Sequence, residues 1–317
     1  MIQERLARLY DWHVQTDDIF FVPGVVTGFN MACRAVGAPG DEVLVESPVY
    51  PPMLAAPENG GRICKVVPLV EGRGRYEHDF DAFERAITGR TALFLLCNPH
   101  NPVGRVFEKA ELERLAEICL RHDVVICSDE IHCDLLFSGH PHTPIASLAP
   151  QVAAQTITFL APSKTYNVAG LSCSVGVAQN RELRNKVKRA GKGLVSHVNV
   201  LGFTAALAAY RDGQEWLDEV LVYLEANRDY LLDYVAEHMP DLRCQKPEGT
   251  YLAWLDCREA GIPGQPYDFF LEQARVALND GAAFGPGGEG FVRLNFGCPR
   301  AILVEALERM RAALETL

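Results

Sequence analysis

The stretch "TALFLLCNPHNPVGRVFEKAELERLAEICLRHDVVICSD" (91–129) contains a complete strand–helix–strand pattern. Its first and last segments, 91–97 and 124–129, are short, almost continuous apolar runs, which are typical of strands buried on both faces of a sheet. Between them, residues 108–122 form a predicted helix with one apolar stripe, made by Leu112, Leu115, Ala116 and Cys119. Two such strands joined by a helix predict a parallel pair with a right-handed crossover.

Similar apolar runs lie on both sides of this unit: "EVLVES" (42–47), "RICKVVPL" (62–69), "TITFLA" (156–161) and "SCSVGVA" (172–178). Helical patterns separate them, so we expect an α/β fold with a mostly parallel sheet and helices on both faces. From about Gln214 the pattern changes to a long charged helix. It is followed by the predicted strands "LRCQKP", "TYLAWLD" and "FVRLNF", a helix near 267–276 and a terminal helix. We therefore predict a large domain over residues 1–215 and a smaller α+β domain over residues 216–317.

The charge and cysteine content limit the possible partners. Acidic residues outnumber basic ones, 41 to 30, and no block of Lys or Arg occurs, which argues against nucleic acid and anionic membranes. The ten cysteines have no zinc-type spacing, so we expect reduced thiols and no metal site. The chain shows neither a signal-peptide pattern nor an apolar run of roughly 20 residues. We therefore expect a soluble cytoplasmic protein.

The segment "APSKTYNVAGL" (161–171) places Lys164 directly after a predicted strand, among small residues. A lysine amine that burial or a cationic neighbour keeps neutral is a nucleophile, and it can form an imine with a carbonyl. A lysine at the end of a strand is otherwise an ordinary surface cation. The chemical interpretation of Lys164 therefore depends on which other residues lie at the same edge of the sheet.

Three further polar residues lie at or just after the ends of predicted strands. Asp129 comes after "VVIC", where its carboxylate could pair with a cation such as a protonated pyridine nitrogen, or simply cap a helix. In "CNPHNPVGRVF" (97–107), His100 and Asn101 follow the strand 91–97. The amide of Asn101 could donate to a phenolate oxygen, although loops rich in Pro, Asn and Gly are often simple turns.

Three more segments have a possible role in ligand binding. In "VPGVVTGFN" (22–30), a glycine turn leads into a helix that begins near Thr27, which suits a phosphate, although no P-loop or dinucleotide fingerprint occurs. Tyr50 in "ESPVYPPM" could stack on a planar ligand or pack into the core. Arg293 in "FVRLNF" fits either a ligand carboxylate or an internal salt bridge. Together, these features are what a pyridoxal phosphate enzyme acting on an amino acid requires.

The whole chain resembles the fold-type I pyridoxal phosphate enzymes of the class I/II aminotransferase superfamily. It is most similar to the MalY/PatB branch of cystathionine β-lyase-like C–S lyases. The resemblance rests on six ordered motifs: "PGVVTGFN", "GDEVLVESPVYPPM", "CNPHNPVGRVF", "SDEIHCDL", "APSKTYNVAGL" and "VRLNFGCPR".

The resemblance implies a role for each matching residue. Lys164 is the expected Schiff-base lysine, Asp129 the partner of the pyridinium nitrogen and Asn101 the donor to the ring hydroxyl. Tyr50 is expected to stack on the ring, and His132 to lie near the ring hydroxyl. The phosphate is expected to bind to Ser163 and to the backbone of Val25, Val26 and Thr27. Arg293 is expected to bind the substrate α-carboxylate.

The chain departs from the family pattern at two places. Many aminotransferases have a phosphate-binding arginine eight residues after the lysine, where this chain has Ser172. Relatives also begin several dozen residues earlier, with a segment that completes the substrate pocket and supplies a tyrosine to the partner subunit's phosphate. From this we expect either a start codon placed too late or a truncated paralogue.

The family implies a homodimer with shared active sites that cleaves a cysteine S-conjugate such as cystathionine to pyruvate, ammonia and a thiol. Two alternatives remain open. One is an aminotransferase that acts on a small amino acid, and the other is a non-catalytic paralogue with a regulatory or interaction role.

Overall fold

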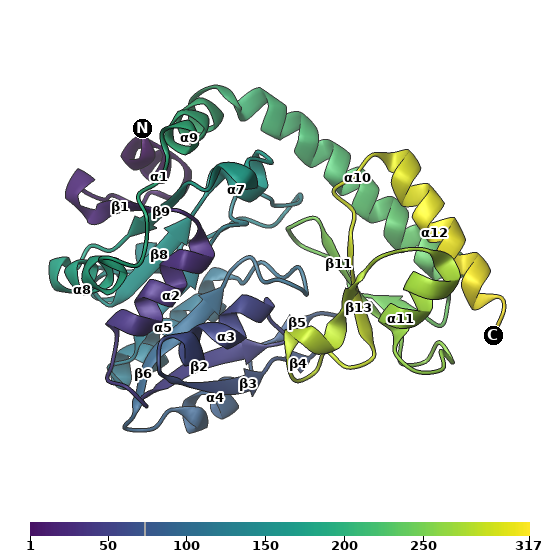
Figure 1. Cartoon of the computed structure of the whole chain (residues 1–317), viewed down its shortest axis with the longest axis horizontal. Helices are drawn as coiled ribbons and strands as arrows, with labels where there is room; N and C mark the ends of the chain where they lie inside the picture. The colour runs from purple at the N-terminus through teal and green to yellow at the C-terminus, as the bar shows by residue number, and fades with distance from the viewer. Residues whose placement is uncertain (73) are drawn as a thin grey trace.

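The computed structural model describes residues 1–72 and 74–317, and its largest element is a seven-stranded sheet (Figure 1). In spatial order its strands are β1 (Ile19–Val22), β9 (Ser174–Val177), β8 (Thr156–Leu160), β7 (Val125–Asp129), β6 (Thr91–Cys97), β2 (Glu42–Ser47) and β3 (Ile63–Pro68). The strands from β8 to β3 are parallel, whereas β9 is antiparallel to both β8 and β1. The expected mostly parallel α/β sheet is confirmed.

Helices cover both faces of this sheet because successive residues of a strand point to opposite sides. In β6, Leu93 and Leu95 share a core with helices α2 (Val25–Ala35), α3 (Pro51–Asn59) and α8 (Arg181–Gly191). On the opposite face, Phe94 and Leu96 share a core with α4 (Phe80–Ala86), α5 (Lys109–Arg121) and α6 (Pro150–Ala154). Burial on both sides explains why the sequence of β6 is almost continuously apolar, since each buried Leu or Phe contributes roughly 2 kcal/mol.

The structure differs from the sequence-based strands at one edge of the sheet. The edge strand β1 was not among the predicted strands, since it has only four residues and all four are apolar, although only Phe20 and Val22 are buried. The predicted strand 172–178 begins later, at Ser174, because Ser172 has a left-handed backbone with φ 50°. Ser172 therefore belongs to the turn that leads into β9.

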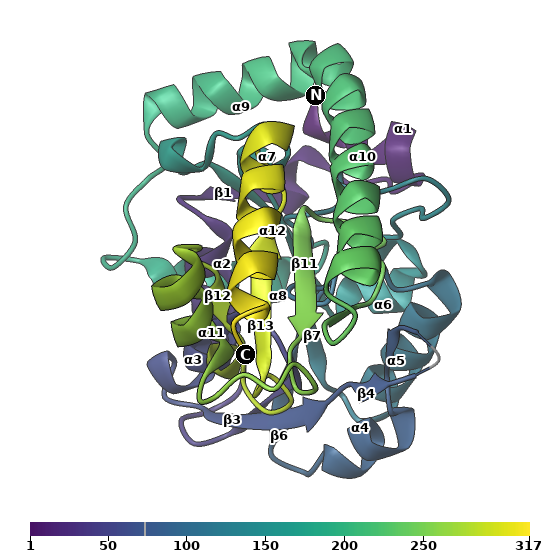
Figure 2. The ribbon, with the colours of Figure 1, turned by 90° about the vertical axis from the view of Figure 1, so that its right-hand side faces the viewer.

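A second, antiparallel sheet lies beside the first (Figure 2). In spatial order its strands are β10 (Arg243–Cys244), β11 (Leu252–Asp256), β13 (Phe291–Asn295) and β12 (Asn279–Asp280). The helices around it are α10 (Gln214–His238), α11 (Pro266–Phe269), which continues as the π-helical turn Phe270–Ala274, and α12 (Arg300–Leu314). Its core contains Leu231, Leu255 and Leu307. This confirms the expected α+β architecture, while the domain boundary at residue 215 stays a prediction.

Among the described residues, the remaining α-helices are α1 (Ile2–Tyr10), α7 (Pro162–Thr165) and α9 (Val200–Asp212), and β4 (Val70–Glu71) pairs with β5 (Tyr76–Glu77) in a two-stranded ladder. Helix α1 packs on the edge of the large sheet, where Leu6 shares a small core with Leu160 of β8 and Val175 of β9. None of the helices in the described part of the chain combines the length and apolarity that a membrane-spanning helix needs.

The ends of the parallel strands define where a site can form. Cys97 at the end of β6 pairs with Asp129 at the end of β7, and Asp129 in turn pairs with Phe159 of β8. The carboxyl ends of these three strands therefore meet at one edge of the sheet. The segments that follow these strands contain Asn101, His132 and Lys164. This edge of the sheet is the usual place for a ligand site in an α/β fold.

Candidate active site

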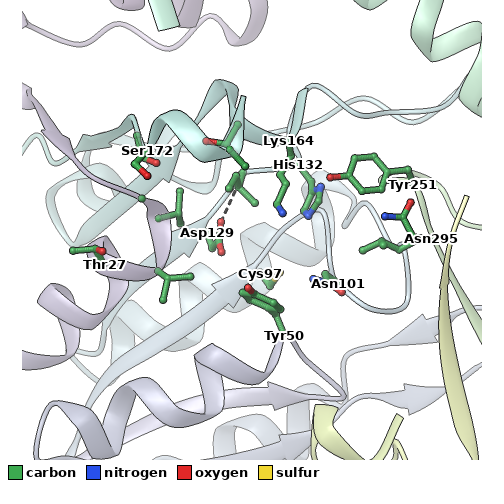
Figure 3. A pocket seen from close by; sticks show the side chains of 18 of the residues that line it. Thr27, Tyr50, Cys97, Asn101, Asp129, His132, Lys164, Ser172, Tyr251 and Asn295 are labelled. Carbon is green, nitrogen blue, oxygen red and sulfur yellow. Dashed lines mark hydrogen bonds between the residues drawn. The ribbon is translucent and has the colours of Figure 1, made fainter. Parts of the chain in front are cut away.

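A cavity of about 350 Å³ lies at this edge and is lined by residues of both sheets and the segments around them (Figure 3). Every candidate residue named from the sequence lines it: Val25, Val26, Thr27, Tyr50, Asn101, Asp129, His132, Ser163, Lys164 and Arg293. These residues come from at least five separate segments of the chain. The structure therefore brings all ten residues together at one cavity, while the role of each residue stays a prediction.

Lys164 lies in α7, a single helical turn that follows β8 almost directly. Pro162 begins this turn, at a position where a missing N–H is no disadvantage. The side chain points into the cavity, and Figure 3 shows its amine near Asp129 and His132. Within the described residues, the amine has no hydrogen-bond or ion-pair partner. Lys164 is therefore available to a ligand.

Asp129 is the last residue of β7 and is only 5% exposed. Its carboxylate accepts one hydrogen bond, from the backbone N–H of Ile131 at 3.1 Å, and forms no ion pair with any described residue. Burial raises the pKa of this carboxyl from its ordinary value of 3.8 to about 7. A cation bound beside Asp129 would compensate for this burial, and a protonated pyridine nitrogen is such a cation.

Arg293 lies on β13 and faces the cavity. Its Nη1 donates to the side-chain oxygen of Asn101 at 2.7 Å and its Nη2 to that of Asn279 at 2.8 Å. Its Nε is buried without a partner, and no carboxylate of the described residues pairs with it. The internal salt bridge that the sequence left open is therefore absent from the described part of the chain. The site instead offers a positive charge for an anionic ligand.

The hydrogen bond from Arg293 determines which group of Asn101 is available to a ligand. Because its oxygen accepts from Arg293, its NH2 group remains available to donate to a ligand. His132, from the segment after β7, is 3% exposed, and its ring meets Tyr251 edge to face at 5.9 Å. Burial, together with the nearby charges of Lys164 and Arg293, lowers the pKa of His132 to about 3. His132 is therefore neutral at physiological pH.

One end of the cavity is suited to an anion. Helix α2 begins there after Gly24, whose φ of 121° is accessible mainly to glycine, and no side chain caps the helix. The first backbone hydrogen bond of the helix comes from Gly28, so the N–H groups of Val25, Val26 and Thr27 are free for a ligand. Three serines also line the cavity: Ser163, Ser172 and Ser174.

Several cavity residues were not identified from the sequence: Pro23, Gly24, Cys97, Ile131, Ala169, Ser174, Tyr251, Leu252 and Asn295. Asn295 could have been found, because it lies two residues after Arg293 in the same strand and therefore on the same side. Ser174 gave a weaker signal, as a small polar residue within an apolar strand; its buried hydroxyl has no partner. The position of Tyr251 follows only from the way the two sheets meet.

Known proteins share this fold and this chain's sequence pattern. A family model described as aminotransferase class I and II matches residues 2–310. Cystathionine beta-lyase PatB of Bacillus subtilis is 42% identical over 96% of this chain and 80% of its own length. The crystal structure of OvoB is 42% identical with a TM-score of 0.95, covering 100% of this chain and 82% of that one. Cystalysin of Treponema denticola, whose structure contains pyridoxal 5'-phosphate, is 34% identical with a TM-score of 0.96, covering 99% and 81%. The chain therefore belongs to the aminotransferase class I and II family.

Proposed function

We propose that this protein is a pyridoxal phosphate-dependent C–S lyase that cleaves a cysteine S-conjugate, such as cystathionine, to pyruvate, ammonia and a thiol. The observation that carries the proposal is that Lys164, Asp129 and Arg293 line one cavity. They supply a nucleophilic amine, a buried carboxylate without a cation and a guanidinium without a carboxylate. The name of PatB, a cystathionine beta-lyase, supports the same substrate class.

The residues present fit pyridoxal phosphate. The carboxylate of Asp129 would hold the protonated ring nitrogen, and the NH2 group of Asn101 would donate to the ring hydroxyl. The free amides at the start of α2 would hold the phosphate, with Ser163 beside them. Tyr50 would lie against the ring, with His132 near its hydroxyl. When bound, the cofactor supplies an electron sink that stabilises negative charge at the substrate Cα.

We assign the proton transfer to Lys164. Its amine, which has no partner among the described residues, would remove the proton from Cα of a bound amino acid. The electron pair left behind allows the thiolate to leave from Cβ, which breaks the C–S bond. The 2-aminoacrylate that is released then hydrolyses to pyruvate and ammonia.

We assign the binding of the substrate α-carboxylate to Arg293. Asn101 and Asn279 hold two of its nitrogen atoms through neutral amide oxygens, so they fix its orientation without neutralising its charge. A guanidinium held in this way can bind a carboxylate through two parallel hydrogen bonds. Fixing the carboxylate would direct the Cα–H bond of the substrate toward the amine of Lys164.

The first test is the replacement of Lys164. We expect Lys164→Ala to abolish both pyruvate release from cystathionine and the visible absorbance of the lysine-bound cofactor. The matched control is Lys109→Ala, because Lys109 is 66% exposed on α5 and should be dispensable. Full lyase activity in Lys164→Ala would refute the assignment.

The second candidate function is an aminotransferase, which the family description favours. Lys164 would remove the same Cα proton, the cofactor would supply a carrier for the amino group that is transferred to the 2-oxo acid, and no β-substituent would leave. Incubation with cystathionine alone, and separately with an amino acid and 2-oxoglutarate, distinguishes the two reactions. Pyruvate from the first incubation supports the lyase, and a new amino acid from the second supports the aminotransferase.

We also propose that the protein forms a homodimer, with a second copy covering the exposed apolar side of α9. Val200, Leu201 and Leu207 of this helix are 74%, 65% and 45% exposed, and Phe203 contacts the exposed Phe21 of β1. Exposed apolar patches of this kind favour an interface. Light scattering should give twice the chain mass of 35.0 kDa, and Leu201→Arg should shift it toward the monomer. A wild-type monomer would contradict the proposal.

We further propose that the protein is located in the cytoplasm. All ten cysteines are free thiols, which is typical of proteins kept in a reducing compartment. Detection of the protein in the soluble cytosolic fraction of its source cells would test this, and recovery from an extracytoplasmic fraction would contradict it.

A further inference from the structure

The buried carboxylate of Asp134 lies outside the cavity and contacts the residue next to Lys164. Asp134 follows His132 by two residues, and its side chain is 5% exposed. Its Oδ1 accepts a hydrogen bond from Nη2 of Arg5 at 2.6 Å. Its Oδ2 accepts from the hydroxyl of Thr165 at 3.2 Å. Each oxygen of this carboxylate therefore binds a different segment of the chain.

Arg5 provides the charge that makes burial of this carboxylate possible. It lies in α1 with its side chain 10% exposed, and its guanidinium lies 4.8 Å from the centre of the Tyr210 ring of α9. The hydroxyl of Tyr10 is 3.5 Å from Oδ1 of Asp134 and adds a weak contact. Within the described residues, Arg5 is the only cation paired with Asp134. The network thus joins α1, α7, α9 and the segment after β7.

The contact with Thr165 matters because Thr165 is the neighbour of Lys164. Helix α7 has only four residues, and within the described part of the chain this is the only hydrogen bond made by one of its side chains. Thr165 is 1% exposed, so its hydroxyl has little access to bulk solvent as an alternative partner. The Thr165–Asp134 bond therefore restrains the rotation of the turn that directs Lys164 into the cavity.

We infer that Asp134 is a positioning residue for Lys164. Arg5 holds the carboxylate of Asp134 in place, and this carboxylate orients Lys164 through the hydroxyl of the neighbouring Thr165. The inference rests on the proposed function, in which Lys164 moves the Cα proton. His132 lies on the same short segment as Asp134, so the network also couples the position of His132 to that of Lys164. Small displacements of a reacting group cause large losses of rate, which is why such a restraint matters.

The test compares Thr165→Val, which removes the hydroxyl but keeps the shape, with Thr165→Ser, which keeps the hydroxyl. The control is Thr158→Val, because Thr158 is a buried residue of β8 whose hydroxyl has no partner. We expect kcat for lyase activity to fall roughly tenfold in Thr165→Val, equivalent to about 1.4 kcal/mol. KM should remain near the wild-type value. Thr165→Ser should recover most of the rate, and Thr158→Val should match the wild type.

Two readouts that do not depend on turnover accompany the kinetics. One is the pH titration of the visible absorbance of the lysine-bound cofactor, which should shift in Thr165→Val and return in Thr165→Ser. The other is the rate at which Lys164 of the cofactor-free protein is acetylated by acetic anhydride, measured by peptide mass spectrometry. It should change in Thr165→Val and stay unchanged in Thr158→Val.

The outcomes separate this inference from the proposed function. If the wild type releases no pyruvate, the proposed function fails, while the acetylation rates still test the link between Thr165 and Lys164. The inference would be overturned if Thr165→Val had the kcat of the wild type, the same pH titration of the cofactor absorbance and the same acetylation rate of Lys164. The lyase assignment would then remain intact. Equal losses in Thr165→Ser and Thr165→Val would also overturn it, because the hydroxyl would then have no specific role.

Discussion

The buried carboxylate of Asp129 leads to a prediction that can be tested without any substrate. Asp129→Asn replaces the carboxylate with an amide of the same shape, which does not titrate. In the cofactor-free protein, burial raises the pKa of Asp129 from 3.8 to about 7. The folded state therefore holds this proton more tightly than the unfolded chain does. The resulting stabilisation is present below about pH 4 and is lost as the pH rises through 7.

The size of the effect follows from these two values. Each pH unit between the unfolded and folded pKa values removes about 1.4 kcal/mol of stability from the wild type. Between about pH 5 and about pH 8, the wild type should lose about 2–3 kcal/mol through Asp129 alone. All other titrating groups are common to both proteins and cancel in the comparison. Asp129→Asn should therefore gain about 2–3 kcal/mol relative to the wild type over this range.

The assay is urea unfolding of both cofactor-free proteins at the two pH values. The matched control is Asp17→Asn, which changes an exposed aspartate. Adding pyridoxal phosphate should then stabilise the wild type more than Asp129→Asn, because only the carboxylate can pair with the ring nitrogen. A stability difference between the two proteins that does not change with pH would refute the reasoning. So would equal stabilisation by the cofactor.

Three further predictions concern two other cavity residues and the Arg5–Asp134 pair outside the cavity. Arg293→Lys keeps the charge but loses the planar fork, so KM for the amino acid substrate should rise roughly tenfold to hundredfold in steady-state assays. Ser174→Ala removes a buried hydroxyl that has no protein partner. Pyridoxal phosphate should then bind roughly tenfold more weakly in a fluorescence titration, without loss of stability in the cofactor-free protein. Arg5→Ala leaves the carboxylate of Asp134 buried and unpaired, so urea unfolding should show a loss of about 3–5 kcal/mol. The three predictions would be contradicted by an unchanged KM in Arg293→Lys, an unchanged cofactor affinity in Ser174→Ala and an unchanged urea midpoint in Arg5→Ala.

Much of the fold and the site could be predicted because the relevant signals are local. The buried strands β2 and β6 match the predicted apolar runs at both ends, since burial on both faces leaves little ambiguity in the sequence. Lys164, Asp129 and Asn101 could be assigned to this edge because each lies at or just after the end of such a strand and has a chemistry that is unusual there, while their roles stay predictions. Parallel strands bring their carboxyl ends together, so three positions far apart in sequence could be assigned to one edge.

What could not be predicted depends on contacts between distant parts of the chain. Arg293 and Asn101 are 192 residues apart, and nothing in either segment indicates that the amide orients the guanidinium. Asp134 contacts Arg5 and Thr165, which are 129 and 31 residues away. Tyr251 reaches the cavity only because the small sheet packs against the edge of the large one. Such residues have no periodic or chemical signature of their own in the sequence.

The distribution of paired and unpaired charges distinguishes the ligand site from the framework around it. In the described part of the chain, all buried acidic residues except Asp129 contact a basic side chain: an arginine in the case of Asp18, Glu248 and Asp256, and a histidine in the case of Glu46 and Glu130. An unpaired buried carboxylate is costly, and it is tolerated where a ligand supplies the missing charge. Asp134 lies five residues after Asp129 in the same segment and is paired with Arg5. Two carboxylates of one segment therefore have different surroundings, which is why we propose that Asp129, which lines the cavity, binds a ligand and that Asp134, paired with Arg5, supports the residues beside it.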